Sequence, residues 1–391
     1  MKDTACPIAS STGSITDAIA AVTHPNPYPW YAALRAGPAL VFDPGLRLWI
    51  ASRAEVVREV LASEAMRVRP AAEPVPRAIA GAPAGEVFAH LVRMNDGAPH
   101  AAYKPLLHRA LAGLDPARVR ASTLEVAARM PPAGLADTCF ALPVSVVANL
   151  LGFADEELPR VADWMRDFVA CLSPLSSEAQ LQAASAAAAA LVARFEQLVA
   201  ARPAAGGTLL AAVQAHAPDD RSRPLLANLV GLLSQTCEAT AGLLGNSLLA
   251  LAREPGLRRK LGTRMDLLPA LVAEVARHDP SIQNTRRFVA EPTVVAGVDL
   301  APGDTILLVL AAANRDPSLN PAPATFEPMR ADRRTLGFGH GKHLCPGHTL
   351  ALTIAAAGVE ELLTDGLDAN TLLDHGWAYR PSVNARIPQF H

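Results

Sequence analysis

One short stretch of the sequence combines metal-ligating side chains with flexible backbone. The stretch TLGFGHGKHLCPGHTLAL, residues 335–352, holds three histidines, one cysteine and four glycines. Imidazole nitrogen and thiolate sulfur are good ligands for transition metals, and glycines let a backbone fold closely around a bound group. A phosphate loop is excluded, because that motif needs glycine at the position of Leu336 and Ser or Thr at the position of His343.

Three other chemistries could use this stretch. A zinc site could use His340, His343, Cys345 and His348, but these four side chains converge poorly if a helix starts between Cys345 and His348. A buried structural cysteine explains Cys345 but not its neighbours. The remaining interpretation is a thiolate bound to haem iron. A helix beginning at about Cys345 would favour the thiolate through free N–H groups and the positive end of the helix dipole.

The same stretch resembles the haem loop of the cytochrome P450 family, whose pattern is F-G-x-G-x-[HR]-x-C-x-G. The pattern is matched by Phe338, Gly339, Gly341, His343, Cys345 and Gly347. The resemblance implies haem b, iron protoporphyrin IX, as cofactor, with Cys345 as the ligand of the iron. It also implies that His343 donates a hydrogen bond to a haem propionate.

Further family motifs follow in the expected order. Glu274 and Arg277 match E-x-x-R, and ATFEPMR supplies Arg330 for F-x-P-x-R, which implies a buried structural network of these three side chains. By resemblance, His100 and Lys104 correspond to H-x-x-x-R and Arg287 to Q-x-T-x-R, so we expect them to bind the propionates. Lys104 replaces the usual arginine and offers a single point charge. Arg286 is the alternative to Arg287.

The segment between Pro224 and Pro255 is long and apolar enough to cross a bilayer. Polar residues at its middle argue instead for a helix buried through the centre of a soluble protein. By resemblance, this helix crosses above the haem and carries [AG]-G-x-[DE]-T-[TS]. The acid is present as Glu238, but Ala239 stands at the alcohol position. The catalytic candidates are Gln235, Glu238, Ala239 and Thr240. We expect Thr236 to bond only to helix carbonyls.

The missing hydroxyl leaves several functions open, because splitting dioxygen needs a proton donor within hydrogen-bond reach. The resemblance favours a monooxygenase that oxidises a small organic substrate with dioxygen and electrons from an external partner. Thr240, Gln235 or a substrate hydroxyl would then replace the usual threonine. The alternatives are a peroxide-using enzyme or a non-hydroxylating enzyme that couples, dehydrogenates or otherwise tailors its substrate. A non-catalytic haem sensor is also considered, but it has no need of Glu238.

The elements that position these residues suggest a mainly helical protein. We expect a hairpin around Asp43-Pro44-Gly45, helices over most of 116–268, and two strands around Pro302-Gly303-Asp304. A long irregular run follows, then a helix from about Cys345 and a final β-turn unit. The predicted fold class is mainly α with small β-sheets. We expect one cytochrome P450-like domain over 25–391 and a flexible segment over 1–24.

Charge and cysteine content limit the partners. The formal net charge of -2 gives no basic field for nucleic acid or a membrane surface, so we expect neither. Five dispersed cysteines and no evident leader predict a reducing, cytoplasmic location. We also expect a monomer. Electrons would come from a ferredoxin or flavodoxin with its reductase. The expected docking patch consists of Arg109, Arg333, Arg334 and Lys342. The candidate substrate contacts are Gly231, Ser234, Gln235, Ile282 and Val383.

Overall fold

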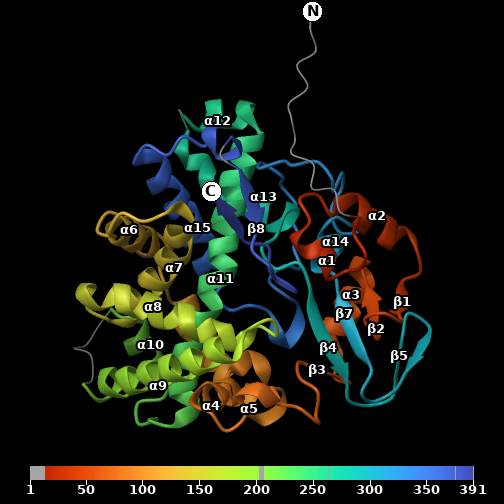
Figure 1. Ribbon diagram of the computed structural model, residues 1–391, viewed down its shortest axis with the longest axis horizontal. Coiled ribbons are helices and arrows are strands. Elements are labelled where there is room, and N and C mark those ends of the chain that lie inside the picture. The colour runs from red at the N-terminus through yellow and green to blue at the C-terminus, as the bar shows by residue number, and fades with distance from the viewer. Residues whose placement is uncertain (1–13, 202–206, 263, 375, 391) are drawn as a thin grey trace, which may run out of the picture.

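Helix α11 (Arg223–Arg253) runs through the middle of the computed structural model, which describes residues 14–201, 207–262, 264–374 and 376–390 (Figure 1). The helix begins at the Ser222 N-cap, whose hydroxyl accepts a hydrogen bond from the N–H of Leu225, and Pro224 occupies its first turn. From Leu225 to Leu249 every residue is buried except Gln235, Thr236, Glu238 and Ala239. The prediction of a central buried helix is confirmed. These four partly exposed residues form the stretch at its middle that solvent can reach, which we call the open space.

Helices packed on α11 make up most of the molecule. Its neighbours include α4, α7, α9, α13 and α15. The helices other than α11 are α1 (Ala20–Thr23), α2 (Tyr28–Ala36), α3 (Ala54–Ala62), α4 (Pro83–His90), α5 (Gly97–Ala112), α6 (Pro116–Ala127), α7 (Leu135–Leu151), α8 (Leu158–Phe168), α9 (Glu178–Ala200), α10 (Leu209–His216), α12 (Pro255–Leu261), α13 (Leu268–His278), α14 (Leu310–Asn314) and α15 (His348–Thr364). Short 3₁₀ turns are η1 (Arg77–Ile79), η2 (Val92–Met94), η3 (Asp155–Glu157), η4 (Val169–Leu172), η5 (Met265–Leu267), η6 (Gly341–His343) and η7 (Thr371–Leu373).

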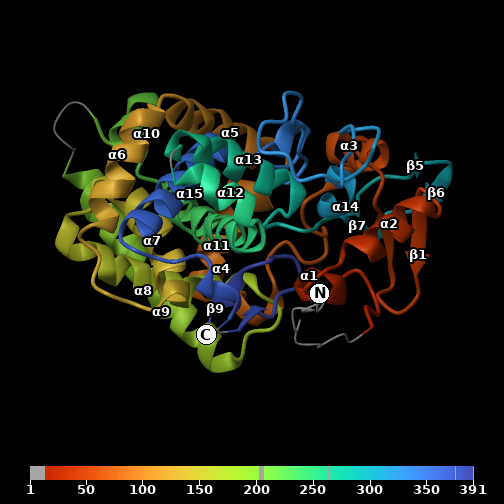
Figure 2. The ribbon, with the colours of Figure 1, turned by 90° about the horizontal axis from the view of Figure 1, so that it is seen from above.

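A five-stranded sheet lies to one side of the helices (Figures 1 and 2). Its strand order is β1-β2-β7-β4-β3, formed by β1 (Leu40–Asp43), β2 (Leu48–Ala51), β3 (Met66–Arg67), β4 (Thr285–Val289) and β7 (Thr305–Leu308). Strands β2 and β7 are parallel and the other pairs are antiparallel. The predicted hairpin is confirmed as β1 and β2. The Asp43 carboxylate accepts hydrogen bonds from the N–H groups of Gly45 and Leu46, which fixes the turn.

The strands expected around Pro302-Gly303-Asp304 are arranged differently from the prediction. The hairpin consists of β5 (Thr293–Val295) and β6 (Val298–Leu300), and its turn is at Ala296 and Gly297, both with positive φ. The turn at Gly303 leads instead into β7, which pairs with β2 and β4. Strands therefore lie on both sides of Pro302-Gly303-Asp304, as predicted, but they do not pair with each other, because the partners of β7 lie far away in the sequence.

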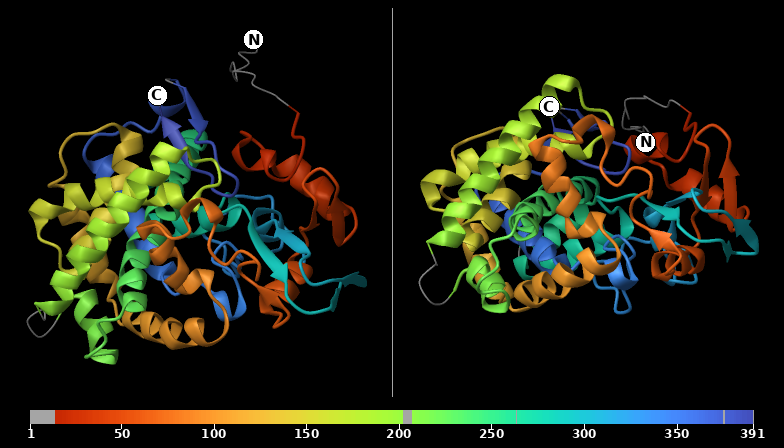
Figure 3. Two further views of the ribbon diagram at one scale, coloured as in Figure 1. Left: turned by 60° about the horizontal axis from the view of Figure 1, so that its bottom comes forward. Right: turned by 90° about the horizontal axis from the view of Figure 1, so that it is seen from below.

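The C-terminal residues form a small antiparallel pair that packs on α11. The pair is β8 (Trp377–Tyr379) with β9 (Pro388–Phe390), as the predicted β-turn unit required. Gly242 of α11 makes the close approach possible, since an added Cβ would lie 2.7 Å from Ser281 Cβ and 2.8 Å from the Arg386 carbonyl oxygen. Figure 3 shows this pair beside the helical part, on the side away from the sheet strands β5 and β6.

Residues 14–24 pack onto the rest of the chain. Ala21 and Val22 of α1 are fully buried, and the Arg386 guanidinium donates to the carbonyls of Val22 and His24. Residues 1–13, where the expected flexible segment starts, lie outside the described residues. The boundary at residue 25 stays a prediction.

One described helix, α9, is long and apolar enough by length and composition to cross a membrane. Core helices of water-soluble proteins pass the same test. In this structure α9 packs along α8 and α4, and its Arg194 is ion-paired with Glu157 at 2.6 Å between Nε and Oε1.

Candidate active site

The glycines of the cysteine loop hold a tight turn ahead of helix α15. The N–H of Cys345 donates to the carbonyl of Phe338 at 2.8 Å, closing the loop. Gly339 and Gly341 have φ of 79° and 66°, values that favour glycine. A Cβ on Gly341 would lie 3.2 Å from the Leu61 carbonyl oxygen, so this glycine also allows α3 to approach.

The position of Cys345 corrects one expectation about its thiol. Helix α15 begins at His348 with Gly347 as N-cap, because Pro346 and Gly347 form the turn into the helix, so Cys345 precedes it by three residues. Burial raises the pKa of Cys345, and the Gly347 N–H and the Lys104 ammonium only partly offset this. The helix terminus alone therefore does not hold a thiolate. A bound cation such as iron would supply the missing charge.

Two histidines and an aspartate lie together next to the loop. His343 Nε2 is 2.9 Å from Asp96 Oδ1, and the rings of His343 and His100 are 4.4 Å apart. Although burial raises the pKa of Asp96, hydrogen bonds from His343 and the Val68 N–H lower it to about 2. Burial, together with His343 and Lys104, lowers the pKa of His100 to about 4. Asp96 was not predicted as a site residue from the sequence. Its position four residues before His100 was the one signal that could have indicated it.

The other two expected propionate partners are oriented differently. Lys104 donates through Nζ to the Leu344 carbonyl at 2.5 Å, inside the cysteine loop. Arg287, in β4, is buried and donates to the carbonyl of Arg286 at 2.8 Å. Burial lowers the pKa of Arg287, and no described carboxylate lies within ion-pair distance of it. Arg286 is exposed on the same strand.

These side chains fit a haem group. His100 Nε2 is enclosed and has no hydrogen-bond partner among the described residues. Arg287 is buried and forms no ion pair within 4 Å with a described carboxylate, although the Asp96 charge lies near enough to raise its pKa. Both features match the need to bind carboxylate oxygens. The cysteine loop provides the soft ligand, and the open space beside α11 borders residues with small or polar side chains. The donor set is therefore suited to a haem with two propionates and a sulfur ligand.

The expected Glu274 network is present, with one additional member. Arg277 donates to Glu274 through Nη2 at 2.6 Å and Nε at 3.0 Å, and both side chains are fully buried. Arg333 Nε is 3.0 Å from Glu274 Oε2, while Arg330 Nε is 3.5 Å from Oε1. Burial raises the pKa of Glu274, but these donors and the Glu327 N–H lower it overall. Arg333, expected in a docking patch, belongs to this network.

Polar side chains at the middle of α11 bond mainly to their own helix. Thr236 donates to the Leu232 carbonyl at 2.7 Å, which confirms the expectation for this residue. Gln235, expected to point at ligand, donates to the Gly231 carbonyl at 3.0 Å yet remains partly exposed. Thr240 is fully buried, and its hydroxyl has no partner within the described part of the chain. Ala239 is partly exposed at the open space.

Two arginines that the sequence analysis missed lie beside Glu238. The carboxylate of Glu238 accepts a short hydrogen bond from Arg380, which follows β8. Burial lowers the pKa of Arg93, in η2, and the nearby charge of Glu238 partly offsets this effect. No local motif marks either arginine, because 142 residues separate Arg380 from Glu238.

The remaining substrate candidates are only partly brought together. Ser234 is buried and donates to the Gly231 carbonyl, and an added Cβ on Gly231 would meet Leu91 at 3.0 Å, so both take part in packing. Ile282 bridges to Ala385, next to the C-terminal unit that contains partly exposed Val383. Their substrate roles stay predictions.

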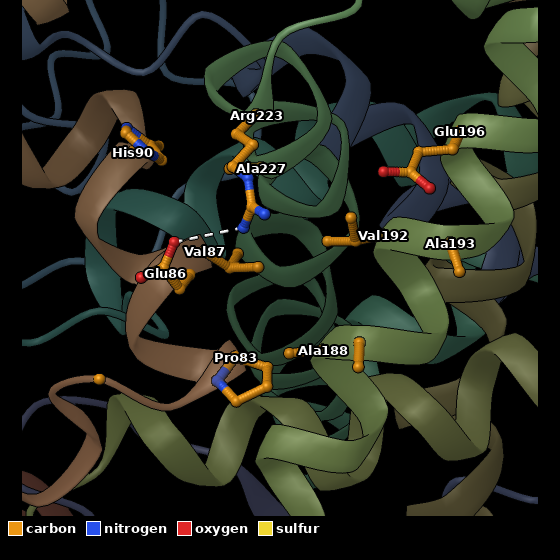
Figure 4. A pocket seen from close by; sticks show the side chains of 12 residues that line it. Pro83, Glu86, Val87, His90, Ala188, Val192, Ala193, Glu196, Arg223 and Ala227 are labelled. Atoms are coloured by element: carbon orange, nitrogen blue, oxygen red, sulfur yellow. Dashed lines mark hydrogen bonds and ion pairs between the residues drawn. The ribbon is translucent and has the colours of Figure 1, made fainter.

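A separate cavity of about 630 Å³ lies between α4, α9 and the start of α11 (Figure 4). Figure 4 shows Glu86 paired with Arg223 across it, with His90, Val192 and Glu196 around its wall. Ala227, the lining residue of α11 furthest along that helix, precedes Glu238 by eleven residues, roughly 16 Å along the axis. This cavity is therefore distinct from the space at Glu238.

Comparisons with known proteins identify the family. A model described as "Cytochrome P450" matches residues 239–364. The chain is 31% identical to cytochrome P450 monooxygenase PikC of Streptomyces venezuelae, over 86% of this chain and 83% of that protein. It is 29% identical to the biotin biosynthesis cytochrome P450 of Bacillus subtilis (strain 168), over 64% of each chain, just under two thirds of that relative. The crystal structure of CalO2 superposes with a TM-score of 0.79 at 25% identity and covers 97% of both chains.

The chain belongs to the cytochrome P450 family. It is a cytochrome P450 monooxygenase of the bacterial type, and its mainly helical architecture with small sheets is the fold of that family. Membership implies a haem-thiolate cofactor.

Proposed function

We propose that the protein binds haem b through Cys345 and oxidises a small organic substrate with dioxygen and electrons from an external partner. The observation that supports this best is the unpartnered His100 Nε2 beside a cysteine loop closed by Cys345 and Phe338. His100, Arg287 and Lys104 would hold the propionates, while Phe338, Gly339, His343 and Gly347 shape the loop. When bound, the haem supplies dioxygen binding and oxygen transfer to the substrate.

The proton pathway is the atypical part of the proposal. Ala239 has no hydroxyl, and Thr240 is enclosed, so neither presents a donor to the open space. Gln235 and Glu238 are partly exposed there. We therefore assign proton delivery to Glu238, with Gln235 orienting water or substrate near it.

The alternative of peroxide use or non-hydroxylating chemistry is favoured by the same Ala239, because peroxide brings its own protons. A head-to-head assay separates the two functions. Substrate conversion with ferredoxin, reductase and dioxygen should exceed conversion with hydrogen peroxide alone. Product formed only with peroxide would reject the dioxygen-dependent function, and no product with either would favour a sensor.

The electron donor is proposed to be a ferredoxin or flavodoxin that docks near the cysteine loop of a cytoplasmic, monomeric enzyme. Of the expected docking patch, Arg109 and Arg334 are exposed. Lys342 is paired with Glu64 at 3.1 Å and Asp96 at 3.7 Å, and Arg333 with Glu274. The patch therefore reduces to Arg109 and Arg334, which form no ion pair with any residue that the structure describes. Leu344, which is exposed and precedes Cys345 in the cysteine loop, offers an apolar contact for a partner.

A further inference from the structure

The open space at the middle of α11 carries more positive than negative charge. Arg380 and Arg93 bring two guanidinium groups, and Glu238 brings one carboxylate. The other titratable neighbours, Cys171 and Cys237, stay neutral because burial raises the pKa of both thiols. One positive charge therefore has no described counter-charge at this place.

Arg93 is the group left without partners. Its Nε is enclosed and bonds to nothing among the described residues, and its guanidinium forms no ion pair within 4 Å there. Arg386 shows what a satisfied buried arginine looks like in the same protein. It donates to the Asp279 carboxylate and to the carbonyls of Val22, His24 and Pro25. The Arg93 side chain as a whole is partly exposed and one of its donors is unmet, which suits this arginine for binding an anion.

The elements that carry the three charges place them at the substrate side of the proposed site. Glu238 lies on the partly exposed stretch of α11 with Gln235 and Ala239. Arg93 lies in η2, just ahead of the helix with His100, and Arg380 follows β8. Three segments distant in sequence thus converge next to the residues assigned to proton delivery.

We propose that Arg93 and Arg380 bind a carboxylate of the substrate, so that the substrates of this enzyme are organic acids. This inference rests on the proposed function, whose substrate class it specifies. A monoanion matches the single uncompensated charge, whereas a phosphate dianion would leave one negative charge in excess. The planar fork of an arginine also fits the two oxygens of a carboxylate. The acid would be held at one end, with its carbon chain beside Ala239.

The test measures binding to the haem-loaded protein by titration calorimetry, without turnover. The probes are matched pairs, octanoate with octanamide and 4-phenylbutanoate with 4-phenylbutanamide, and phenyl phosphate as the dianion. We expect at least one acid to bind ten-fold or more tightly than its own amide. Arg93→Gln and Arg380→Gln should each reduce that ratio at least five-fold, and Arg93→Lys should reduce it less. Arg120→Gln, which removes a surface partner of Glu360, is the matched control and should leave the ratio unchanged.

Several results would overturn the inference. These are amides that bind as well as the acids, no binding of any acid at millimolar concentration, or an acid preference that survives in both glutamine variants. Tighter binding of phenyl phosphate than of every acid would replace the carboxylate assignment. The CO spectrum of the same samples keeps the two proposals apart. A normal spectrum without acid preference rejects only this inference, and acid preference with an abnormal spectrum rejects only the proposed haem-thiolate function.

Discussion

At the scale of single residues, Ala239 stands where the family motif has threonine, and the proposed proton delivery therefore moves to a neighbouring side chain. Glu238 is the one acid on the partly exposed stretch of α11, and Thr240 is enclosed by the helix packing. We therefore assign the proton donor from exposure, which cannot be read from the sequence motif. Glu238 and Thr240, two residues apart on the same helix, can be compared directly.

Glu238→Gln should lower dioxygen-driven turnover roughly 10²-fold, the usual effect of losing a general acid. Thr240→Val, which replaces the hydroxyl with a methyl group of similar size, should change dioxygen-driven turnover less than about three-fold, because that hydroxyl does not reach the open space. Steady-state rates with a ferredoxin system measure both. Peroxide-driven turnover is the control and should survive in Glu238→Gln. A larger loss in Thr240→Val than in Glu238→Gln would contradict the assignment.

A second residue-scale prediction concerns pH. His278 accepts a hydrogen bond at Nδ1 from Arg315 and is 3.0 Å from the Ala324 carbonyl through Nε2. Burial and the Arg315 charge lower the pKa of His278 to about 4. At a pH between about 6.5, the pKa of histidine in the unfolded chain, and the lower pKa in the folded chain, the unfolded chain binds a proton that the folded chain does not. Stability therefore falls as pH drops through this window.

His278→Asn should remove up to one proton from the slope of the free energy of unfolding against pH between 6.5 and 4. Urea titrations over this range measure the slope. His108→Asn on the exposed face of α5 is the control and should keep the wild-type slope. An unchanged slope in the His278 variant would show that this side chain titrates alike in both states.

At the scale of elements, two contacts tie the cysteine loop and α11 to the rest of the fold. Arg333 and Arg277 surround the Glu274 carboxylate between α13 and the irregular run before the loop. Arg333→Gln should lower the free energy of unfolding by about 3 kcal/mol, because the buried Glu274 carboxylate loses one of its positively charged partners. The neighbouring Arg334 is exposed, so Arg334→Gln should cost less than about 0.5 kcal/mol. Denaturant unfolding distinguishes them, and equal effects would argue against Arg333 as a network member.

Gly242 provides the second contact, where α11 meets the segment before β9. Gly242→Ala should cost about 1–3 kcal/mol, because its Cβ would overlap the Ser281 side chain and the Arg386 backbone. Gly256→Ala in α12 is the matched control, since its Cβ would meet only the tip of Arg259 at 3.9 Å. The control should be neutral or stabilising by up to about 1 kcal/mol. Thermal unfolding measures both variants, and a neutral Gly242→Ala would show that the crossing can relax.

At the scale of the whole molecule, sequence patterns predicted contacts between residues that are close in the sequence and missed contacts between residues that are far apart in it. Some features span only a few residues, so their spacing in the sequence specifies them. They are the turn of the cysteine loop, the Glu274-Arg277 pair and the β1-β2 hairpin. The pairing of His343 with Asp96 joins residues 247 apart, and β7 joins distant strands. Arg380, which follows β8, reaches Glu238 because β9, the partner strand of β8, packs against α11. Such contacts depend on topology and could not be read from spacing.

The central claim is that Cys345 binds haem iron as a thiolate, and the CO spectrum of the reduced protein tests it most directly. We expect the wild type to show the red-shifted absorption band typical of thiolate ligation. Cys345→His should still bind haem but lose that band, because imidazole replaces sulfur. Cys237→Ser on α11 is the matched control and should keep the band. The account would be contradicted if Cys345→His gave the same band as the wild type.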